Sequence, residues 1–373
     1  MTALSVGGIG EWPGDVRVVD LLFTPTATFM KRILFRADGT SQTGMGHIMR
    51  SLALAEMLAV PGTGTSPTTR PVADENETPL FERRFASHEP SEAVLKTVAK
   101  HGILTIPLVT NNLDEFLGYV TPNDVVVLDG YNFDAYFQRA VREKAHKLVF
   151  IDDLMTGTQV ADVVINHAGD VTAVDYQTEP YTKLLLGAGY ALVNPAFQQK
   201  AQPKDGENKA FVNMGGADPN NISREVVELL LTENEDLRVT VVLGSANPHA
   251  DTFADLPKDR LSILQNLSAK QMARAIGGSG LSVVAASTIA YEVATVSRPM
   301  VIIQTADNQS RLVSFMRDRH LTLGALTLPL APDKFQAAVA KARLTPTVFK
   351  QRLIFDGKAA ARYQQLFKQL CAE

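Results

Sequence analysis

Residues 30–50 read MKRILFRADGTSQTGMGHIMR, and this stretch decides the fold. The apolar run at residues 32–36 predicts a strand, and apolar residues spaced three and four apart over residues 48–58 predict a helix. Gly44 and Gly46 lie in the loop between them, where a residue without a side chain lets the backbone approach a ligand closely. A strand, a glycine loop and a helix in this order direct backbone N–H groups toward an anion. The stretch therefore predicts an α/β fold with an anion-binding edge.

Short apolar, β-branched runs recur along the rest of the chain and alternate with helical patterns such as residues 134–146. They predict strands at residues 124–129, 147–151, 162–166, 210–214, 239–243, 261–264, 281–285, 300–304 and 322–326. Strands that are apolar at nearly every position, with helices between them, are typical of parallel sheets covered on both faces. We therefore expect two Rossmann-type lobes, each built on a parallel sheet.

The length of 373 residues is too great for one compact core and favours two domains. Phe197–Asn208 (FQQKAQPKDGEN) is polar, contains Pro and Gly, and separates two series of strands and helices, so it predicts a flexible linker. One lobe is expected over residues 30–197 and the other over residues 208–345. Residues 346–373 carry a long amphipathic pattern, which predicts a C-terminal helix that can pack back on the first lobe.

Two stretches depart from this pattern. Residues 61–79 are rich in Pro, Thr and Gly and show no periodicity, so they predict a surface insertion. Residues 1–29 are interpreted as an extension before Met30, which resembles a natural start; the alternative is an ordered extra strand at Val16–Phe23. They lack the basic start, apolar core and cleavage site of a secretory signal, and a cytoplasmic protein is expected.

The composition excludes several classes of protein. A hydrophobic fraction of 45% is ordinary for a globular chain and excludes wholesale disorder, and a net charge of −4 argues against nucleic acid as the main partner. The single cysteine, Cys371, cannot form an internal disulfide or a thiolate zinc site. No run of about eighteen apolar residues occurs, so no integral membrane contact is expected. The oligomeric state is left open.

His47 is the main candidate for chemistry in the first half. It lies in the first turn of the expected helix and is directed toward the same loop, and its pKa range suits a general base near neutral pH. The alternative is a capping or packing histidine. His167 follows an expected strand, so it can border the same edge. No histidine pair or histidine–carboxylate pair has a metal-ligand spacing, and adjacent Asp152 and Asp153 favour a loop or capping role.

The second half repeats the glycine-loop pattern. Gly215 and Gly216, in MGGADPNN, follow a strand and precede a helix. Ser287 or Thr288 can cap a later helix, whose start would favour a diphosphate. Glu292 is four residues beyond Thr288, so it shares a helix face with it and is placed to accept ribose hydroxyls; the alternative is a solvated surface acid. The segment TADNQ lies at the same edge, after another strand.

Together these segments resemble the PseG family of UDP-2,4-diacetamido-2,4,6-trideoxy-β-L-altropyranose hydrolases of pseudaminic acid biosynthesis, relatives of the MurG-type glycosyltransferases. The resemblance runs from about Met30 to about Leu326 and rests on FRADG, GMGHIMRSLALAE, VVVLDGYNFD, FIDDL, GYALVNPAF, NMGGADPNN, AASTIAYEV and TADNQ, in that order. It implies a GT-B fold with the active site in the cleft between the lobes. It also implies hydrolysis that releases UDP and the free sugar without a metal or another cofactor.

Carried over by position, the resemblance implies a catalytic role for His47. Among the substrate-binding residues that it implies, Tyr131 matches a tyrosine lining the sugar site. The substrate-binding set as a whole is Arg36, Asp38, Gly44, Gly46, Asp129, Tyr131, Asn308 and Gln309, and the UDP-binding set is Gly215, Gly216, Ser287, Thr288 and Glu292. The chain departs from the family at Gly130, where members often have histidine, and in the extension and the insertion.

The mechanism that we expect is an inverting displacement in which His47 deprotonates a water molecule. Backbone N–H groups near Ser287 and Thr288 would stabilise the departing diphosphate. One alternative is a glycosyltransferase that passes the sugar to a hydroxyl acceptor. A membrane-associated transferase would be expected to show a basic–apolar patch for a lipid acceptor; no such cluster stands out, Phe81–Phe85 (FERRF) being the nearest, which favours water. The other alternative is a non-catalytic nucleotide-sugar binding protein.

Overall fold

The computed structural model describes residues 31–39, 45–59, 81–198, 206–244, 247–344 and 347–373. The predicted extension at residues 1–29, the predicted insertion at residues 61–79 and Gly44 lie outside these ranges. Lys31–Glu373 forms one compact unit that contains two large parallel sheets. Both sheets confirm the α/β prediction.

The first sheet has seven strands in the order β3-β2-β1-β4-β5-β7-β9, and every neighbouring pair is parallel. Its strands are β1 (Arg32–Ala37), β2 (Glu82–His88), β3 (Leu104–Leu108), β4 (Asp124–Asp129), β5 (Lys147–Ile151), β7 (Val163–Asn166) and β9 (Lys183–Leu186). A separate pair is formed by β6 (Thr158–Gln159) and β8 (Gln177–Thr178). The expected strands at the centre of the sheet are confirmed.

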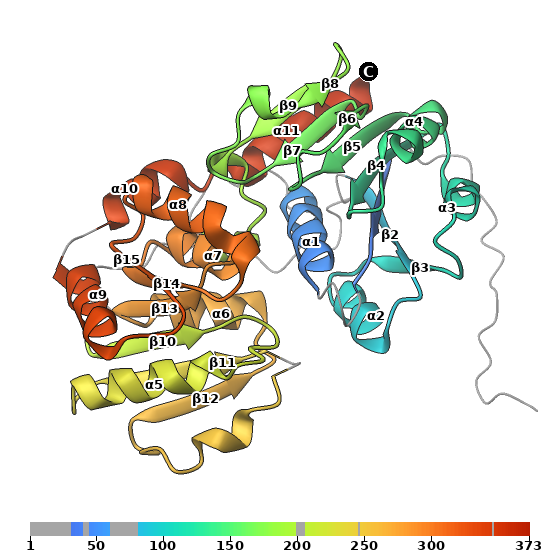
Figure 1. Ribbon diagram of the computed structural model, residues 1–373. Coiled ribbons are helices and arrows are strands. Elements are labelled where there is room, and N and C mark those ends of the chain that lie inside the picture. The colour runs from blue at the N-terminus through green and yellow to red at the C-terminus, as the bar shows by residue number, and fades with distance from the viewer. Residues whose placement is uncertain (1–30, 40–44, 60–80, 199–205, 245–246, 345–346) are drawn as a thin grey trace, which may run out of the picture. The chain divides into compact units, whose positions relative to one another are not determined.

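Helices cover both faces of this sheet (Figure 1). One face packs against α1 (Gly46–Ala59), α2 (Glu92–Ala99) and α11 (Ala359–Ala372). The other face packs against α3 (Leu113–Tyr119) and α4 (Ala135–Lys144). Burial on both faces explains why β4 reads as a continuous apolar run, DVVVLD.

The sequence did not predict three strands of the first sheet, β2, β3 and β9. β2 begins with charged, partly exposed residues, and β3 is a largely exposed strand at the sheet edge, so neither shows a long apolar run. The segment Phe81–Phe85, a candidate basic–apolar surface patch, runs into β2, and both of its phenylalanine side chains are buried in the core. It is therefore part of the sheet and not a patch for a lipid acceptor.

The second sheet has six parallel strands in the order β12-β11-β10-β13-β14-β15. Its strands are β10 (Lys209–Asn213), β11 (Arg238–Leu243), β12 (Leu261–Gln265), β13 (Leu281–Ala285), β14 (Met300–Gln304) and β15 (Gly324–Thr327). One face packs against α5 (Ile222–Glu233) and α9 (Pro332–Leu344). The other packs against α6 (Ala269–Gly277), α7 (Thr288–Val296) and α8 (Ser310–Asp318). The last strand begins two residues later than predicted.

The single helix predicted over residues 346–373 is wrong, because the segment forms α10 (Val348–Ile354) and α11 with a break between them. Gly357 has φ of 78°, a left-handed conformation that interrupts a helix and that glycine adopts readily. Phe355, before the break, packs with α7 side chains, whereas Gln364, after it, donates a hydrogen bond to the Met57 carbonyl of α1 at 2.7 Å. The break lets the chain leave one core and end on the other.

The segment before the predicted linker also differs from expectation. Phe197, placed at the end of the first lobe, packs with side chains of α6 and α7 in the core of the second sheet. The first sheet itself ends with β9, at Leu186. The chain therefore reaches the second core before residue 197, and residues 199–205 of the predicted linker lie outside the described ranges.

Candidate active site

A buried carboxylate, Asp129, organises the group of polar side chains at the carboxyl end of β4. Its side chain is fully buried and accepts hydrogen bonds from three residues of α1. His47 Nδ1 lies 2.8 Å from Oδ1, Arg50 Nη2 donates to Oδ1 at 2.6 Å, and Ser51 Oγ donates to Oδ2 at 3.0 Å. Residues three and four apart on a helix share a face, so α1 presents all three to the same carboxylate.

Arg50 links Asp129 to a second carboxylate. Its Nη1 donates to Asp153 Oδ2 at 2.7 Å, and Asp153 follows β5, the strand next to β4. Burial alone would raise the pKa of Asp129, but Arg50 and the hydrogen bond from His47 hold that pKa below its usual value. Asp129 is therefore ionised, and its charge is fully paired.

The contacts of His47 favour one tautomer of its ring. Nδ1 faces both Asp129 Oδ1 and Arg50 Nη2, the latter at 3.1 Å. An ionised carboxylate only accepts hydrogen bonds, and Arg50 Nη2 lies closer to Asp129 Oδ1, at 2.6 Å, than to Nδ1, so we assign to the neutral ring the tautomer in which Nδ1 donates to Asp129. The Tyr131 ring meets the imidazole edge-on, with ring centroids 4.7 Å apart. In this tautomer of the neutral ring, Nε2 has the lone pair that a general base requires.

A cavity of about 340 Å³ lies at this edge of the sheet. Tyr131 and Asp153 line it, together with residues that follow β4 and β5. Tyr131, at 56% exposure, offers an aromatic face to a ligand. The cavity thus adjoins the side chains that hold His47 and Arg50, and it is large enough for a small polar molecule.

Arg36 and Asp38 have a supporting position. The Arg36 guanidinium is only 1% exposed, lies over the rings of Phe116 and Phe133, and donates to Asp38 at 2.5 Å. Asp38 in turn accepts the His88 N–H at 2.8 Å. Arg36 was predicted to bind substrate, but its burial directs the guanidinium into the core, where it holds the loop after β1.

Of the two glycines predicted in the loop before α1, the structure describes Gly46 and not Gly44. Gly46 is the first residue of α1, next to His47, as the sequence led us to expect.

The two adjacent aspartates after β5 have different roles. Asp152 accepts the N–H groups of Leu154 and Met155 at 3.1 and 2.9 Å, which confirms the predicted capping role, whereas Asp153 pairs with Arg50.

The glycine loops of the second sheet lie in close backbone contact. Gly215 has φ of 90°, a conformation that other residues rarely adopt. A Cβ atom at Gly244 would lie 2.1 Å from the Gly216 carbonyl oxygen, so a side chain there would force the loops after β10 and β11 apart. Asp218 caps α5 by accepting the N–H groups of Ile222 and Ser223 at 2.8 and 2.9 Å.

Glu292 lies one turn inside α7. Ser287 is the N-cap residue of this helix, but its side chain makes no capping hydrogen bond, and Thr288 is the first helical residue. Burial raises the pKa of Glu292 to about 8. None of the residues that the structure describes forms a hydrogen bond or ion pair with its carboxyl group. A lone carboxyl group in a poorly solvated position is available to hydrogen-bond donors from a ligand.

Asn308 and Gln309 lie after β14, in a short 3-10 turn at Asp307–Gln309. Gln309 accepts the Thr305 N–H at 2.8 Å, so its side chain shapes its own loop. Asn308 is exposed and can reach a bound molecule. Of the two predicted substrate-binding residues, the structure leaves Asn308 accessible and ties Gln309 into the loop.

Sequence reasoning missed three members of the cluster around Asp129: Arg50, Ser51 and Asp153. Arg50 and Ser51 could have been found from their spacing of three and four residues after His47, which places them on one helix face. Asp153 depends on which strand lies beside β4, and the sequence does not give that order. Asp129 itself was expected only through the family resemblance.

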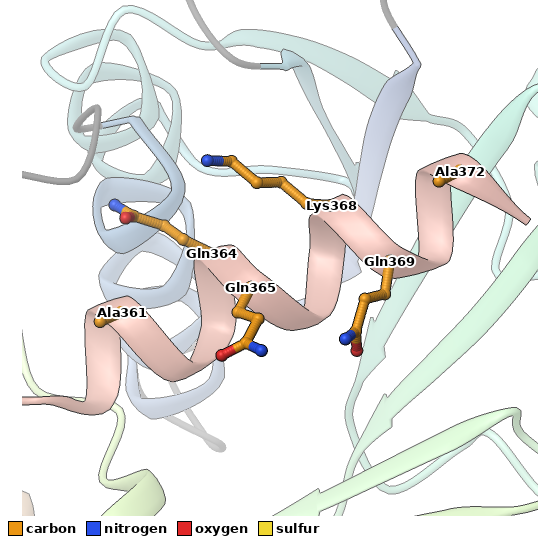
Figure 2. A pocket seen from close by; sticks show the side chains of 6 residues that line it. All are labelled: Ala361, Gln364, Gln365, Lys368, Gln369 and Ala372. Carbon is orange, nitrogen blue, oxygen red and sulfur yellow. The ribbon is translucent and has the colours of Figure 1, made fainter.

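A second cavity, of about 400 Å³, lies along α11 (Figure 2). Its lining contains one charged side chain, Lys368, beside glutamines and alanines, which gives it no acid–base pair. Within the described ranges, no group of three or more His, Cys, Asp or Glu side chains is arranged to hold a metal ion. Among the described helices, none is both long and apolar enough to cross a membrane.

Comparison with known proteins shows distant relationships, and no family model matches the chain. The uncharacterized protein MJ1062 of Methanocaldococcus jannaschii is 25% identical over 288 residues, which cover 73% of this chain and 55% of that protein. The chain thus spans about half the length of that relative. The UDP-2,4-diacetamido-2,4,6-trideoxy-β-L-altropyranose hydrolase of Campylobacter jejuni is 24% identical over 266 residues, covering 70% of this chain and 87% of the hydrolase.

A third relative is the spore coat polysaccharide biosynthesis protein SpsG of Bacillus subtilis, 22% identical over 308 residues, which cover 80% of this chain and 84% of SpsG. Among solved structures, the calicheamicin glycosyltransferase CalG4 superposes with a TM-score of 0.58 at 13% identity, covering 92% of this chain and 99% of CalG4. MurG of Acinetobacter baumannii superposes with a TM-score of 0.53 at 15% identity, covering 90% of this chain and 95% of MurG. The protein has the GT-B fold of two Rossmann-like lobes.

Proposed function

We propose that this protein is a nucleotide-sugar hydrolase that releases UDP from a UDP-linked 2,4-diacetamido-2,4,6-trideoxy sugar. The observation that carries the proposal is the pairing of His47 Nδ1 with buried, ionised Asp129, which makes Nε2 the nitrogen that would accept a proton. The distant relationship to the Campylobacter jejuni hydrolase supports the substrate class. UDP-2,4-diacetamido-2,4,6-trideoxy-β-L-altropyranose is therefore the first substrate to test.

In this mechanism a water molecule attacks the anomeric carbon of the sugar. His47 Nε2 accepts a proton from the water as the new C–O bond forms, and Asp129 stabilises the imidazolium through Nδ1. The bond between the anomeric carbon and the diphosphate oxygen breaks, and UDP leaves with the electron pair. The displacement inverts the configuration at the anomeric carbon.

The residues of the second sheet would hold the nucleotide. Gly215 and Gly216 let the loop after β10 approach the diphosphate, and the start of α7 near Ser287 and Thr288 presents N–H groups to it. Glu292 would accept hydrogen bonds from the ribose hydroxyls. Tyr131 and Asn308 would contact the sugar. This assignment gives the base to the first lobe and the nucleotide to the second.

A glycosyltransferase is the second candidate, because the cavity of about 340 Å³ lined by Tyr131 and Asp153 could hold a hydroxyl acceptor. The same His47 would then deprotonate that hydroxyl group in place of water. The solved structures with this fold include glycosyltransferases, which fits either reaction.

The deciding experiment incubates the purified protein with UDP-2,4-diacetamido-2,4,6-trideoxy-β-L-altropyranose and follows UDP and free sugar, with and without added N-acetylglucosamine as a hydroxyl acceptor. A hydrolase releases both products in buffer alone, at a rate that the acceptor does not change. UDP release that requires the acceptor would replace the hydrolase with the transferase. Binding of the nucleotide sugar without turnover in either condition would contradict both.

A further inference from the structure

His167 lies on the same face and edge of the first sheet as the cluster around Asp129. In the parallel register, Asp129 of β4 is opposite Ile151 of β5, and Ile151 is opposite Ile165 of β7. Residues two apart on a strand point to the same face. Asp153 and His167 each lie two positions beyond one of these isoleucines, so they form a row on the face that Asp129 occupies. The contact of Asp153 with Arg50 shows that this row faces α1.

The contacts of His167 fix its protonation state. Its Nδ1 accepts the Leu192 N–H at 3.1 Å, so the ring is neutral and its proton is on Nε2. The Tyr291 ring packs edge-on against it, with ring centroids 5.5 Å apart, and Tyr291 donates its hydroxyl proton to the His167 carbonyl at 3.2 Å. Burial and the charge of Arg50 lower the pKa of His167 to about 4. No described residue accepts a hydrogen bond from Nε2.

The charges around His167 decide which kind of ligand suits this donor. Asp129, Asp153 and Arg50 are the charged groups that act on it, two negative and one positive. These three side chains together carry a net negative charge, which disfavours a diphosphate at this position. A neutral oxygen, such as a sugar hydroxyl or an amide carbonyl, suits a neutral N–H donor better.

We propose that His167 is a sugar-binding residue, which donates a hydrogen bond from Nε2 to a hydroxyl or amide oxygen of the bound nucleotide sugar. The inference rests on the proposed function. His47, which pairs with Asp129 at the end of β4, acts on the attacking water, whereas His167, after β7, holds the sugar in place.

Two substitutions separate this role from a structural one. In His167→Asn the side-chain oxygen occupies the place of Nδ1 and can still accept the Leu192 N–H, but the Nε2 donor is lost. In His167→Gln the side-chain nitrogen occupies the place of Nε2 and can still donate, but the acceptor for Leu192 is lost. A ligand-binding role predicts that His167→Asn impairs turnover more, whereas a structural role predicts that His167→Gln does.

For His167→Asn we expect kcat/KM for UDP release from UDP-2,4-diacetamido-2,4,6-trideoxy-β-L-altropyranose to fall roughly three- to tenfold, the usual effect of one neutral hydrogen bond. His167→Gln should retain more of the activity while lowering the melting temperature. Unchanged turnover in His167→Asn, or the reverse order of the two variants, would overturn the inference and leave the proposed function standing. No UDP release by the unmodified protein would overturn both.

A binding measurement identifies the part of the ligand that His167 contacts. In a His47→Ala background, where turnover is slow, the affinity for the intact nucleotide sugar and for UDP alone can be measured by calorimetry. Adding His167→Asn should weaken binding of the nucleotide sugar and leave UDP affinity within twofold of its value. An equal loss for both ligands would place the contact on the nucleotide and contradict the inference.

Discussion

The two carboxyl groups assigned to the candidate site lie in opposite environments. Asp129 at the end of β4 is fully buried, yet Arg50, His47 and Ser51 pair with it and keep its pKa low. Glu292 in α7 has no partner among the described residues, and burial raises its pKa to about 8. The first group is organised without a ligand, whereas the second lacks the donors that would stabilise its charge.

This difference fits the parts that the two groups would play. A base must be held in one tautomer before the reaction begins, and a paired carboxylate does this at no cost in reorganisation. A nucleotide-binding carboxyl group needs no hydrogen-bond donor from the protein before the ligand binds, because the ribose hydroxyls supply the donors. The comparison therefore predicts different consequences for changes at the two sites.

His47→Ala should have the largest effect. Loss of a general base typically lowers the rate by ~10²–10⁴, so turnover should fall by that factor while UDP affinity stays nearly unchanged. Steady-state kinetics and calorimetry with UDP measure the two quantities. His320→Asn, at an exposed histidine in the turn after α8, is the matched control and should change neither. Wild-type turnover in His47→Ala would remove it from the chemistry.

Asp129→Asn should destabilise the fold as well as inactivate the protein. Removing one partner of a buried ion pair costs about 3–5 kcal/mol, because Arg50 is then left buried without its main counter-charge. Asp153→Asn is the control, since Asp153 is a third exposed and leaves the Arg50–Asp129 pair intact. Denaturant unfolding should show a much smaller loss for this variant. Equal losses would mean that Asp129 is not the organising group.

Glu292→Gln should change how stability depends on pH. With a folded pKa of about 8, Glu292 keeps a proton in the native state that the unfolded chain releases above its ordinary pKa of about 4.5. Its contribution therefore falls as pH rises from about 4.5 to 8, by roughly 2–3 kcal/mol after allowance for partial exposure. Urea unfolding of the two proteins across this range should show the difference, and parallel curves would contradict the raised pKa.

Glu292→Ala should weaken UDP binding by roughly 1–3 kcal/mol, the effect of breaking a buried hydrogen-bonded contact. Glu235→Ala, at an exposed glutamate of the same lobe, is the control and should leave affinity unchanged. Because ribose hydroxyls favour the charged carboxylate, UDP binding near pH 7 should also release protons, which appears as a calorimetric enthalpy that varies with the buffer. Unchanged affinity in Glu292→Ala would remove it from the site.

The burial of each strand explains how much of the fold and of the candidate site could be predicted from the sequence. Central strands such as β4 are buried on both faces and read plainly from the sequence, whereas β2 and β3 lie toward an edge and carry charged or exposed residues. The break between α10 and α11 was missed because the amphipathic pattern continues across it. His47 was predicted from the glycine loop before α1, but its link to Asp153 through Arg50 depends on strand order, which only the structure shows.

Hydrolysis in water enriched in ¹⁸O tests the central proposal most directly. When UDP-2,4-diacetamido-2,4,6-trideoxy-β-L-altropyranose is the substrate, attack at the anomeric carbon places the label on the free sugar and leaves UDP unlabelled. Mass spectrometry of the two products distinguishes these fates. Label on the sugar is the result we predict, and label on UDP, or no label in either product, would contradict the mechanism.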